Sequence, residues 1–398
     1  MLLPASIVQA SAYVSSGADG REQVDMAGEP IRVGLNVPSK PPLGDIKMAV
    51  RICRLAGLHM AAFWDHFQDF IPQSLWTEEH TWLARDRPWT HEHYDYQTLL
   101  GYLASIAGNL LLAVAVTEPQ RRHPVLIAQS LMTLSHMTKR PPILGIGPGE
   151  LENTIPYGVP MDQPVGRLEE ALQIIRMCFT SRGPFDFDGK HFRLRNAVLD
   201  LVPEEGRTPP IWLAAHGPRM LRLTGQYGDG WLPSEVPSHD VYGDLLETIR
   251  RHARESGRDP DAITPAMQPT TILAPTDEDA REILNMRIAR YVGLSLPDDV
   301  YKHYGLSHPL GEGYRGYVDV LPEELSREEL EAAMDKVDPE FLAQAVLWGS
   351  PSRLASELQK YGHAGLRVVS LVPASALASR RMLNYLPRGL WRLRRLLQ

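Results

Sequence analysis

Short apolar runs alternate with segments of helical periodicity from residue 31 to the C-terminus. The apolar runs predict eight strands, at 31–37, 58–64, 110–116, 143–147, 210–215, 230–233, 265–273 and 366–372. Apolar positions spaced three and four apart predict helices between them, at 45–56, 96–107, 124–138, 165–179, 218–227, 241–256, 277–291 and 351–361. Eight strands that alternate with helices predict a parallel (β/α)8 TIM barrel with insertions. An open doubly wound sheet is the alternative.

Three segments fall outside this alternation. Residues 185–192 carry an Asp-Gly pair between aromatic positions, which is typical of a small β-hairpin. A long insertion at about 292–349 separates the seventh helix from the eighth. Residues 1–30 are small and polar with weak periodicity. We expect them to form a flexible N-terminal extension that precedes a single barrel domain over 31–398.

Composition narrows the class of protein. Of the 398 residues, 43% are apolar and 22% charged, which suits a large globular core. A formal charge of −7 gives no basic field, so a nucleic-acid partner is not expected. Cys53 and Cys178 fall in apolar helical patterns and are expected to be reduced core residues, which suits a cytoplasmic enzyme. No apolar run reaches the ~18 residues that span a bilayer.

The fourth predicted strand runs into a glycine-rich loop that ends in a carboxylate. Gly145, Gly147 and Gly149 occupy every second position, and Glu150 follows them. Glycines at a strand end indicate a backbone that passes close to another group, although a tight turn alone would also need them. The spacing does not fit a dinucleotide fingerprint, because Glu150 stands where the third glycine should be.

Other polar residues follow neighbouring strands. Asp65 and His66 follow the second strand, Asn153 lies beyond Glu150, and His216 follows the fifth strand. In a parallel barrel these strand ends share the active face, so we expect His66 and Glu150 to meet there as catalytic residues. An imidazole beside a carboxylate can give a proton to an oxygen or take one from it.

The start of the fifth predicted helix suggests an anion site. Gly217 and Pro218 open the helix, and Arg219 and Arg222 place two cations in its first turns. The helix dipole disfavours cations there unless an anion is present, and backbone N–H groups at a helix start bind phosphate. The alternative is a pair of solvated arginines on an exposed face.

Two further motifs have competing interpretations. His91-Glu92-His93 has the His-x-His form of metal-dependent hydrolase barrels, but it lies in a polar loop and not on the first strand, so no metal site is expected. Residues 389–397 are basic and amphipathic. We expect the last barrel helix, with its leucines packed outside the eighth strand; peripheral contact with a membrane is the alternative.

Three motifs resemble the luciferase-like flavin and deazaflavin oxidoreductases, and within them the branch that depends on coenzyme F420. They are Asp-His-Phe-Gln at 65–68, Gly-Ile-Gly-Pro-Gly-Glu at 145–150, and Ala-Ala-His-Gly-Pro at 214–218 leading to Tyr-Gly-Asp-Gly-Trp at 227–231. The resemblance spans roughly residue 31 to the C-terminus. Segments 149–159, 211–225 and 303–316 are similar, more narrowly, to phthiodiolone and phenolphthiodiolone dimycocerosate ketoreductases.

The resemblance implies coenzyme F420 as cofactor, with FMN as the alternative, and a homodimer. It implies that His66 lies beside the deazaflavin ring and that Glu150 lies near its C5. It also implies a cis peptide near Val114-Ala115 that shapes the seat of the ring. The cofactor-binding residues implied in this way are Asp65, Val114, Ala115, Asn153, His216, Gly217, Pro218 and Arg219.

The expected function is hydride transfer between reduced F420 and a ketone, or the reverse from an alcohol, of a lipid-like or secondary-metabolite substrate. Phe70 stands where the sugar-phosphate dehydrogenases of this branch have tryptophan, so glucose 6-phosphate is not the expected substrate. The alternatives are an FMN-dependent monooxygenase on the same barrel, a metal-dependent hydrolase that uses His91 and His93, and a flavin-binding protein without turnover.

Overall fold

Eight parallel strands form a closed barrel. The computed structural model describes residues 30–204 and 206–398, so the predicted extension lies outside the described residues except for Pro30. The strands are β1 (Arg32–Val37), β2 (Met60–Phe63), β3 (Leu111–Thr117), β4 (Ile143–Ile146), β7 (Ile211–Leu213), β8 (Gly230–Trp231), β9 (Thr264–Met267) and β12 (Val368–Pro373). Each pairs with the next, and β12 pairs with β1. The predicted (β/α)8 barrel is confirmed.

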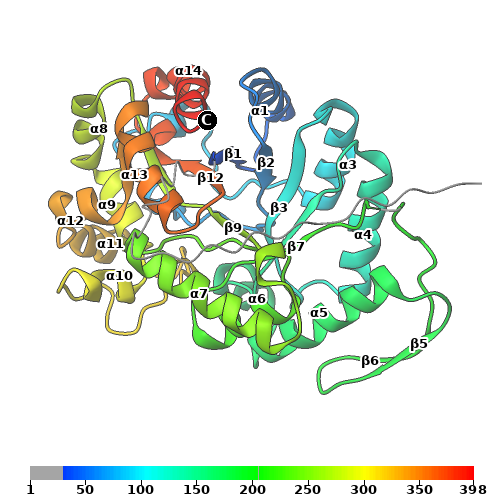
Figure 1. Cartoon of the computed structure of the whole chain (residues 1–398). Coiled ribbons are helices and arrows are strands. Elements are labelled where there is room, and N and C mark those ends of the chain that lie inside the picture. Colours follow the sequence, from blue (N-terminus) through cyan, green and yellow to red (C-terminus); the bar gives the residue numbers. More distant parts are fainter. Residues whose placement is uncertain (1–29, 205) are drawn as a thin grey trace, which may run out of the picture.

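Helices surround the strands (Figure 1). They are α1 (Leu43–Leu55), α3 (Tyr96–Ala107), α4 (Pro124–Met137), α5 (Pro164–Thr180), α6 (Pro218–Tyr227), α7 (His239–Glu255), α13 (Pro351–His363) and α14 (Arg380–Leu396). The side chains of Ser238 and Ser350 cap α7 and α13, and proline occupies the first turn of α4, α5, α6 and α13. The local sequence therefore specifies where these helices begin.

The hydrophobic core has two layers. Outward-facing strand residues such as Leu144 and Leu213 pack against the helices, whereas Met60, Trp212 and Ala266 belong to a smaller cluster inside the barrel. This alternation follows from the period of two along each strand. Cys53 and Cys178 are buried and free in the outer layer, as predicted.

The seventh predicted strand and helix are each divided in two. The strand becomes β9 and β10 (Thr270–Leu273), interrupted at Gln268 and Pro269; a proline has no N–H for the ladder. The helix becomes α8 (Asp277–Leu284) and α9 (Arg287–Leu294). The single elements expected at 265–273 and 277–291 were therefore wrong in their continuity, although their positions were right.

The insertion is folded and has a core of its own. It contains α10 (Asp298–His303), the short helix η5 (Gly316–Val318), α11 (Arg327–Met334), α12 (Pro339–Ala345) and β11 (Leu347–Gly349), which pairs with β10. In Figure 1, α8 to α12 gather on one side of the barrel. Tyr291, Tyr301 and Phe341 are among the residues that form this second hydrophobic cluster.

The remaining elements are short. The hairpin predicted at 185–192 is confirmed as antiparallel β5 (Phe185–Asp188) and β6 (Arg193–Ala197). The loop after β2 carries η1 (Gln73–Leu75) and α2 (Leu83–Asp86), and the loop after β4 carries η2 (Leu151–Asn153) and η3 (Ile155–Tyr157). Two further short helices are η4 (Pro260–Ala262) and η6 (Ala374–Leu377).

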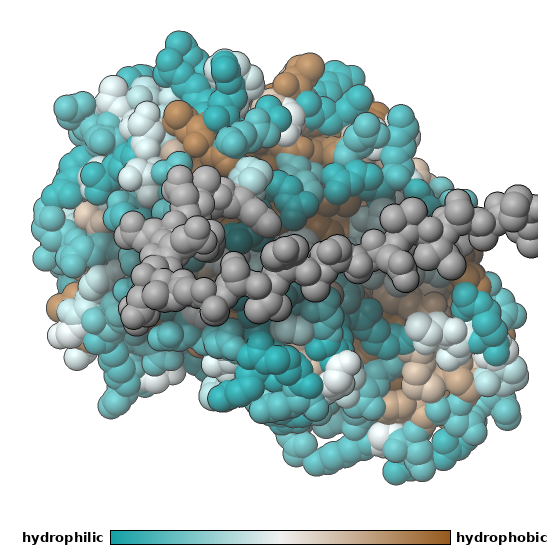
Figure 2. Space-filling model, viewed as in Figure 1, coloured by the Kyte–Doolittle hydropathy of each residue, from teal (hydrophilic) through white to brown (hydrophobic). Residues whose placement is uncertain are grey.

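The C-terminal helix α14 packs on the barrel. Leu386, Leu390 and Leu393 are buried in the outer core, as the barrel-helix interpretation predicted. None of the helices in the described part of the chain is long and apolar enough to cross a membrane. On the face shown in Figure 2 hydrophilic residues predominate and hydrophobic residues form smaller patches.

Candidate functional site

The ends of three strands form the base of the candidate site. Nε1 of Trp64 donates to Oδ1 of Asn36 at 3.1 Å, and Nδ2 of Asn36 donates to Oε1 of Gln268 at 3.1 Å. Asn36 is the last residue but one of β1, Trp64 follows β2 and Gln268 follows β9. These bonds connect strand ends that are far apart in the sequence, so the carboxyl end of the barrel is held in a defined geometry.

His66 and Glu150 meet at this end, as predicted. Nε2 of His66 lies 3.6 Å from Oε2 of Glu150; the His66 side chain is 5% exposed and that of Glu150 is 24% exposed. Burial lowers the pKa of His66 to about 4, an effect that the Glu150 carboxyl opposes only in part. The imidazole is therefore neutral near pH 7, while Glu150 has access to solvent.

A second carboxyl, Glu152, lies on the other side of the same ring. Its Oε1 is 3.8 Å from Nδ1 of His66, and its side chain has no solvent exposure. Burial, and then the neighbouring Glu150 carboxyl, raise the pKa of Glu152 well above its usual range. The sequence interpretation missed Glu152 because η2 turns the chain after Glu150 and brings residue 152 back under the ring.

Asn153 joins the β2 and β4 loops. Its Oδ1 accepts from the backbone N–H of Phe67 at 2.8 Å, and its Nδ2 donates to Oε1 of Glu152 at 2.9 Å. The side chain is 1% exposed. Asn153 therefore positions the backbone next to His66; its contact with a cofactor stays a prediction.

Asp65 belongs to a buried charge network. Its carboxylate contacts Arg121 at 3.2 Å and Arg122 at 3.1 Å, and accepts from the Thr117 hydroxyl at 2.7 Å. These partners balance the buried charge. The carboxylate thus fixes the β2 loop against the end of β3, and direct contact between Asp65 and a cofactor stays a prediction.

The glycine loop approaches β3 closely. A Cβ on Gly145 would overlap the carbonyl oxygen of Val114, and Gly149 has a φ of +100°, which other residues rarely adopt. The nearby cis peptide joins Ala115 to Val116. The resemblance placed it at Val114-Ala115, one residue too early, because sequence alone does not show which bond is turned.

The predicted anion site lies at the start of α6. Gly217, Pro218 and Arg219 are exposed, and no side chain caps the first turn of the helix. Arg219 and Arg222 both contact Glu169 on α5, at 2.9 and 3.0 Å. The two arginines therefore share one carboxylate partner on an exposed face, and the anion site stays a prediction.

His216 is also exposed at this end of the barrel. Its Nε2 lies 3.3 Å from the hydroxyl of Ser234, a residue of the loop after β8. The imidazole thus connects the loops after β7 and β8, next to the start of α6. Its role as a cofactor-binding residue stays a prediction.

His91 and His93 both contact Asp69, but their rings have different further neighbours. His91 accepts from the N–H of Asp69 at 3.0 Å, and its Nε2 contacts Glu323 at 2.9 Å. The ring of His93 lies 5.7 Å from that of His66 and 3.8 Å from Oδ2 of Asp69. His93 therefore supports the His66 site, a placement that the metal interpretation of the motif did not foresee.

Asp69 and Lys40 form a buried ion pair under these rings, with 2.6 Å between Oδ2 and Nζ. Burial opposes the charge of Asp69, but Lys40 and His93 outweigh it and hold the pKa of Asp69 below its usual range. The pair thereby fixes the loop that carries Phe70 and His91.

Aromatic side chains form one wall of the site. The ring of Phe70 stands edge-on to His66 at 4.8 Å and contacts Tyr317 at 4.5 Å. Tyr317 comes from η5 of the insertion, and its hydroxyl lies 3.2 Å from that of Thr270. The insertion therefore contributes directly to the surroundings of His66.

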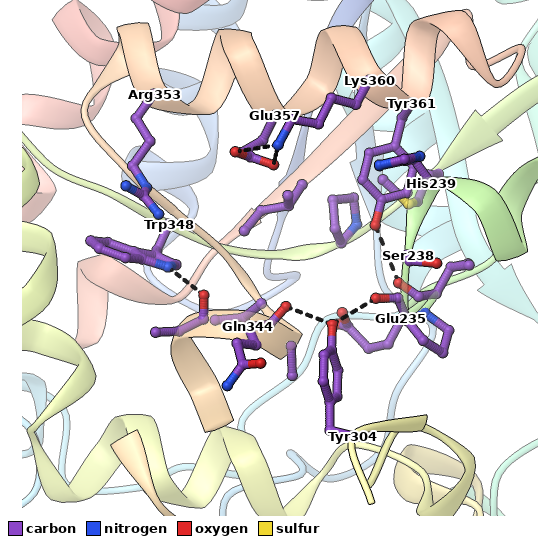
Figure 3. A pocket seen from close by; sticks show the side chains of 18 residues that line it. Glu235, Ser238, His239, Tyr304, Gln344, Trp348, Arg353, Glu357, Lys360 and Tyr361 are labelled. Atoms are coloured by element: carbon purple, nitrogen blue, oxygen red, sulfur yellow. Dashed lines mark hydrogen bonds and ion pairs between the residues drawn. The ribbon is translucent and has the colours of Figure 1, made fainter. Parts of the chain in front are cut away.

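A cavity of about 320 Å³ lies between α13, α12 and the loop after β8 (Figure 3). The hydroxyls of Tyr304 and Tyr361 donate to the carbonyls of Pro237 and Val236 in that loop. Glu235 also lines the cavity; its Oε1 accepts from the N–H of Thr270 at 3.0 Å, and burial raises its pKa to about 7. This carboxyl had no counterpart in the sequence interpretation.

Two curated relatives match most of the chain. The phthiodiolone/phenolphthiodiolone dimycocerosates ketoreductase of Mycobacterium sp. (strain JLS) is 35% identical over 341 residues, 84% of this chain and 90% of the relative. The 5,10-methylenetetrahydromethanopterin reductase of Methanopyrus kandleri is 24% identical and covers 71% of this chain and 82% of its own.

Solved structures share the fold. An F420-dependent secondary alcohol dehydrogenase in complex with an F420-acetone adduct has a TM-score of 0.72 at 18% identity, covering 93% of this chain and 100% of its own. The oxygenating constituent of 3,6-diketocamphane monooxygenase from Pseudomonas putida, in complex with FMN, has a TM-score of 0.63 at 17% identity, covering 93% and 98%. The family profile for luciferase-like monooxygenases matches residues 72–367. The chain therefore belongs to the luciferase-like family.

Proposed function

We propose that this protein is an oxidoreductase that depends on coenzyme F420 and transfers a hydride between the reduced deazaflavin and a ketone, or in reverse from an alcohol. The observation that carries the proposal is the pairing of a neutral, buried His66 with a solvent-accessible Glu150 at the carboxyl end of the barrel. The relatives named as a ketoreductase and a methylenetetrahydromethanopterin reductase support the same class of reaction.

The proposed cofactor site extends from β3 to the start of α6. Coenzyme F420, when bound, supplies or accepts the hydride. The backbone at Val114 and Ala115, beside the cis peptide, would seat its ring, with Asp65 and Asn153 at the edge of the seat. His216, Gly217, Pro218 and Arg219 would hold its phosphate at the uncapped first turn of α6, where backbone N–H groups favour an anion.

His66 and Glu150 are the proposed catalytic residues. Reduction of a ketone places negative charge on the carbonyl oxygen, and that charge needs a proton donor within hydrogen-bond reach. The neutral imidazole of His66 can donate a hydrogen bond from Nε2 to that oxygen, and it can give up this proton only if Nδ1 gains one at the same time. Glu150, being 24% exposed, can exchange protons with solvent between turnovers.

The substrate class follows from the wall of the site. Trp64, Phe70 and Tyr317 surround His66 with apolar surface, which favours a lipid-like or secondary-metabolite ketone over a sugar phosphate. FMN is the alternative cofactor, because the same fold holds FMN in the diketocamphane enzyme. The hydrolase alternative is not favoured, because Nε2 of His91 contacts Glu323 whereas the ring of His93 packs beside His66.

The proposal is tested by anaerobic turnover of reduced F420 with methyl ketones of increasing chain length. We expect oxidation of F420 that depends on the ketone, with kcat/KM rising as the chain lengthens, because each buried methylene adds about 0.8 kcal/mol of binding. Glucose 6-phosphate serves as the control for the reverse reaction and should give no reduction of F420. Turnover that requires oxygen and reduced FMN would contradict the proposal.

A further inference from the structure

Glu152 is a buried carboxyl that the proposed reaction has not yet used. Its Oε1 accepts from Nδ2 of Asn153 at 2.9 Å, and its Oε2 is buried without a hydrogen-bond partner. A carboxylate ion in such surroundings would be costly, and Glu150 close by adds repulsion. Glu152 therefore favours its neutral acid form, and its proton needs an acceptor, for which the nearby Glu150 carboxyl competes.

The imidazole of His66 offers that acceptor. Nδ1 of His66 is buried, has no hydrogen-bond partner and lies 3.8 Å from Oε1 of Glu152. Nε2, on the opposite side of the ring, lies 3.6 Å from Glu150. A hydrogen bond between them requires a side-chain rotation that shortens this 3.8 Å separation between Nδ1 of His66 and Oε1 of Glu152. Since a neutral imidazole carries one N–H, a bond donated to Nδ1 places that N–H on Nε2.

We propose that Glu152 is a positioning residue whose carboxylic acid donates a hydrogen bond to Nδ1 of His66, and that it thereby holds the ring in the tautomer with its N–H directed toward Glu150 and the reacting oxygen. The tautomer follows from the residues of this chain alone. Its catalytic consequence rests on the proposed ketone reduction.

The proposed arrangement forms a proton relay through the ring. As the alkoxide forms, Nε2 of His66 gives its proton to the substrate oxygen, and the acid proton of Glu152 moves to Nδ1. The O–H bond of the alcohol and the new Nδ1–H bond form; the Nε2–H and Glu152 O–H bonds break. Glu152 is left as a carboxylate that accepts from the new Nδ1–H. A proton from water then reaches Nε2 through the partly exposed Glu150, and the Nδ1 proton returns to Glu152.

The surrounding charges are compatible with this arrangement. Besides Glu150, the charged or titratable groups that act on His66 are His93, Asp69 and Arg121. Arg121 also acts on Glu152, but it is already paired with Asp65 and Glu118. Two phenols, Tyr157 and Tyr314, are close enough to Glu152 for its charge to affect them.

The tautomer is measured by ¹⁵N NMR of histidine-labelled protein without cofactor at pH 7, with His66→Gln used to assign the His66 signals. We expect the Nε2–H tautomer in the wild type and in Glu152→Gln, because a glutamine can donate to Nδ1 and still accept from Asn153. Glu152→Leu, which can do neither, should populate the Nδ1–H tautomer. A wild-type ring with its proton on Nδ1, or a folded Glu152→Leu protein with unchanged signals, would overturn the proposal.

The relay is tested separately by kinetics with F420 and a ketone. Glu152→Gln keeps the tautomer but has no acid proton to give, so kcat should fall by about 100-fold and lose the dependence on the Glu152 titration, with KM for the cofactor unchanged. An unchanged kcat and pH profile would refute the relay. If F420 does not bind at all, the proposed function fails while the NMR result still decides the tautomer.

A cation is the competing explanation for the same geometry, because one ligand atom from each of His66, Glu150 and Glu152 lies within 4.8 Å of the others. Elemental analysis of the purified wild-type protein distinguishes the two. We expect no stoichiometric divalent metal. One equivalent of bound metal in the wild type that is absent from Glu152→Gln would show that a cation, and not a proton, lies between these side chains. That result would overturn the proposal.

Discussion

Nε2 of His66 lies 3.6 Å from Oε2 of Glu150, although the two residues follow different strands of the barrel, β2 and β4. The intervening β3 holds these strands in parallel register, and Asn153 connects the loops that follow them. The pair is therefore a product of the barrel geometry and not of local sequence. It is also where the proposed chemistry takes place.

Replacement of Glu150 by glutamine should slow turnover by about 100-fold, because the amide can no longer exchange a proton with solvent. Cofactor affinity should stay within about twofold, since the side chain keeps its size and polarity. Steady-state kinetics and fluorescence binding measure the two effects. Glu78→Gln, at an exposed position, is the matched control. Full activity of Glu150→Gln would remove this residue from the mechanism.

Gly145→Ala should destabilise the barrel by about 1–3 kcal/mol, because the new methyl group would overlap the carbonyl oxygen of Val114. Thermal unfolding measures the change. Gly147→Ala is the control within the same loop, since its nearest heavy atoms would be 3.5 and 3.7 Å away. Equal melting temperatures for the two variants would contradict the prediction and show that β3 shifts to accommodate the extra methyl group.

The pKa of His66 is lowered to about 4 in the folded protein, so the folded state binds a proton less readily than the unfolded chain. The stabilisation from a neutral His66 is complete above pH 6.5 and is lost as the pH falls toward 4. Wild type should therefore lose more stability than His66→Gln over this range. His59, with a similarly low pKa, is present in both proteins and cancels. Parallel unfolding curves would show that His66 titrates normally.

Glu235 should show the opposite dependence. Its pKa is raised to about 7, so the folded protein loses stability as the pH rises from about 4.5 through 7. Glu235→Gln keeps an oxygen to accept from Thr270 but cannot ionise. Denaturant unfolding at pH 5 and pH 8 should show that the free energy of unfolding of the variant, relative to that of the wild type, is higher at pH 8 than at pH 5. A constant difference between the two proteins would mean that the carboxyl is not held neutral.

Lys40→Met should cost about 3–5 kcal/mol, because it leaves the Asp69 carboxylate buried without its cation. Asp69→Asn in the same protein should recover most of that loss. A double-mutant cycle in denaturant measures the coupling. Additive effects of the two substitutions would indicate that the pair contributes little to the loop beside His66.

The barrel could be predicted from sequence because every strand and helix carries its own apolar period. The division of the seventh strand had a local signal in Pro269 that the sequence interpretation did not use, whereas the seventh helix has neither proline nor glycine where it divides, at Asn285 and Met286. The strand-end rule was enough to bring His66 and Glu150 together. Predictions of this kind work where local pattern and topology agree.

The positions of Glu152, His93 and Glu235 in the fold were not predicted from the sequence, and the reason is the same for all three. Each lies in a loop or short helix whose path is set by packing, so no period shows which way its side chain points. The sequence did contain a signal for Glu152, because Glu150 and Glu152 stand two positions apart directly after the glycine-rich loop. The placement of His93 beside His66 depends on a loop of about 30 residues between β2 and α3, whose path no motif specifies.

Three sequence-based expectations concern the protein in the cell. The homodimer implied by the resemblance stays a prediction, which analytical ultracentrifugation tests. The cytoplasmic location and the absence of membrane contact also stay predictions. Cosedimentation with anionic vesicles tests membrane contact. If the protein stays bound to the vesicles at about 0.15 M salt, the membrane interpretation of α14 is favoured.

Equilibrium binding of the purified protein to coenzyme F420, with FMN and NADPH in parallel, tests the central claim most directly because it needs no substrate. We predict that F420 binds at least about tenfold more tightly than FMN, a difference of about 1.4 kcal/mol, and that NADPH does not bind measurably. Arg219→Ala should weaken F420 binding and leave the fold intact. A preference for FMN would contradict the proposed cofactor and make oxygen the next reactant to test.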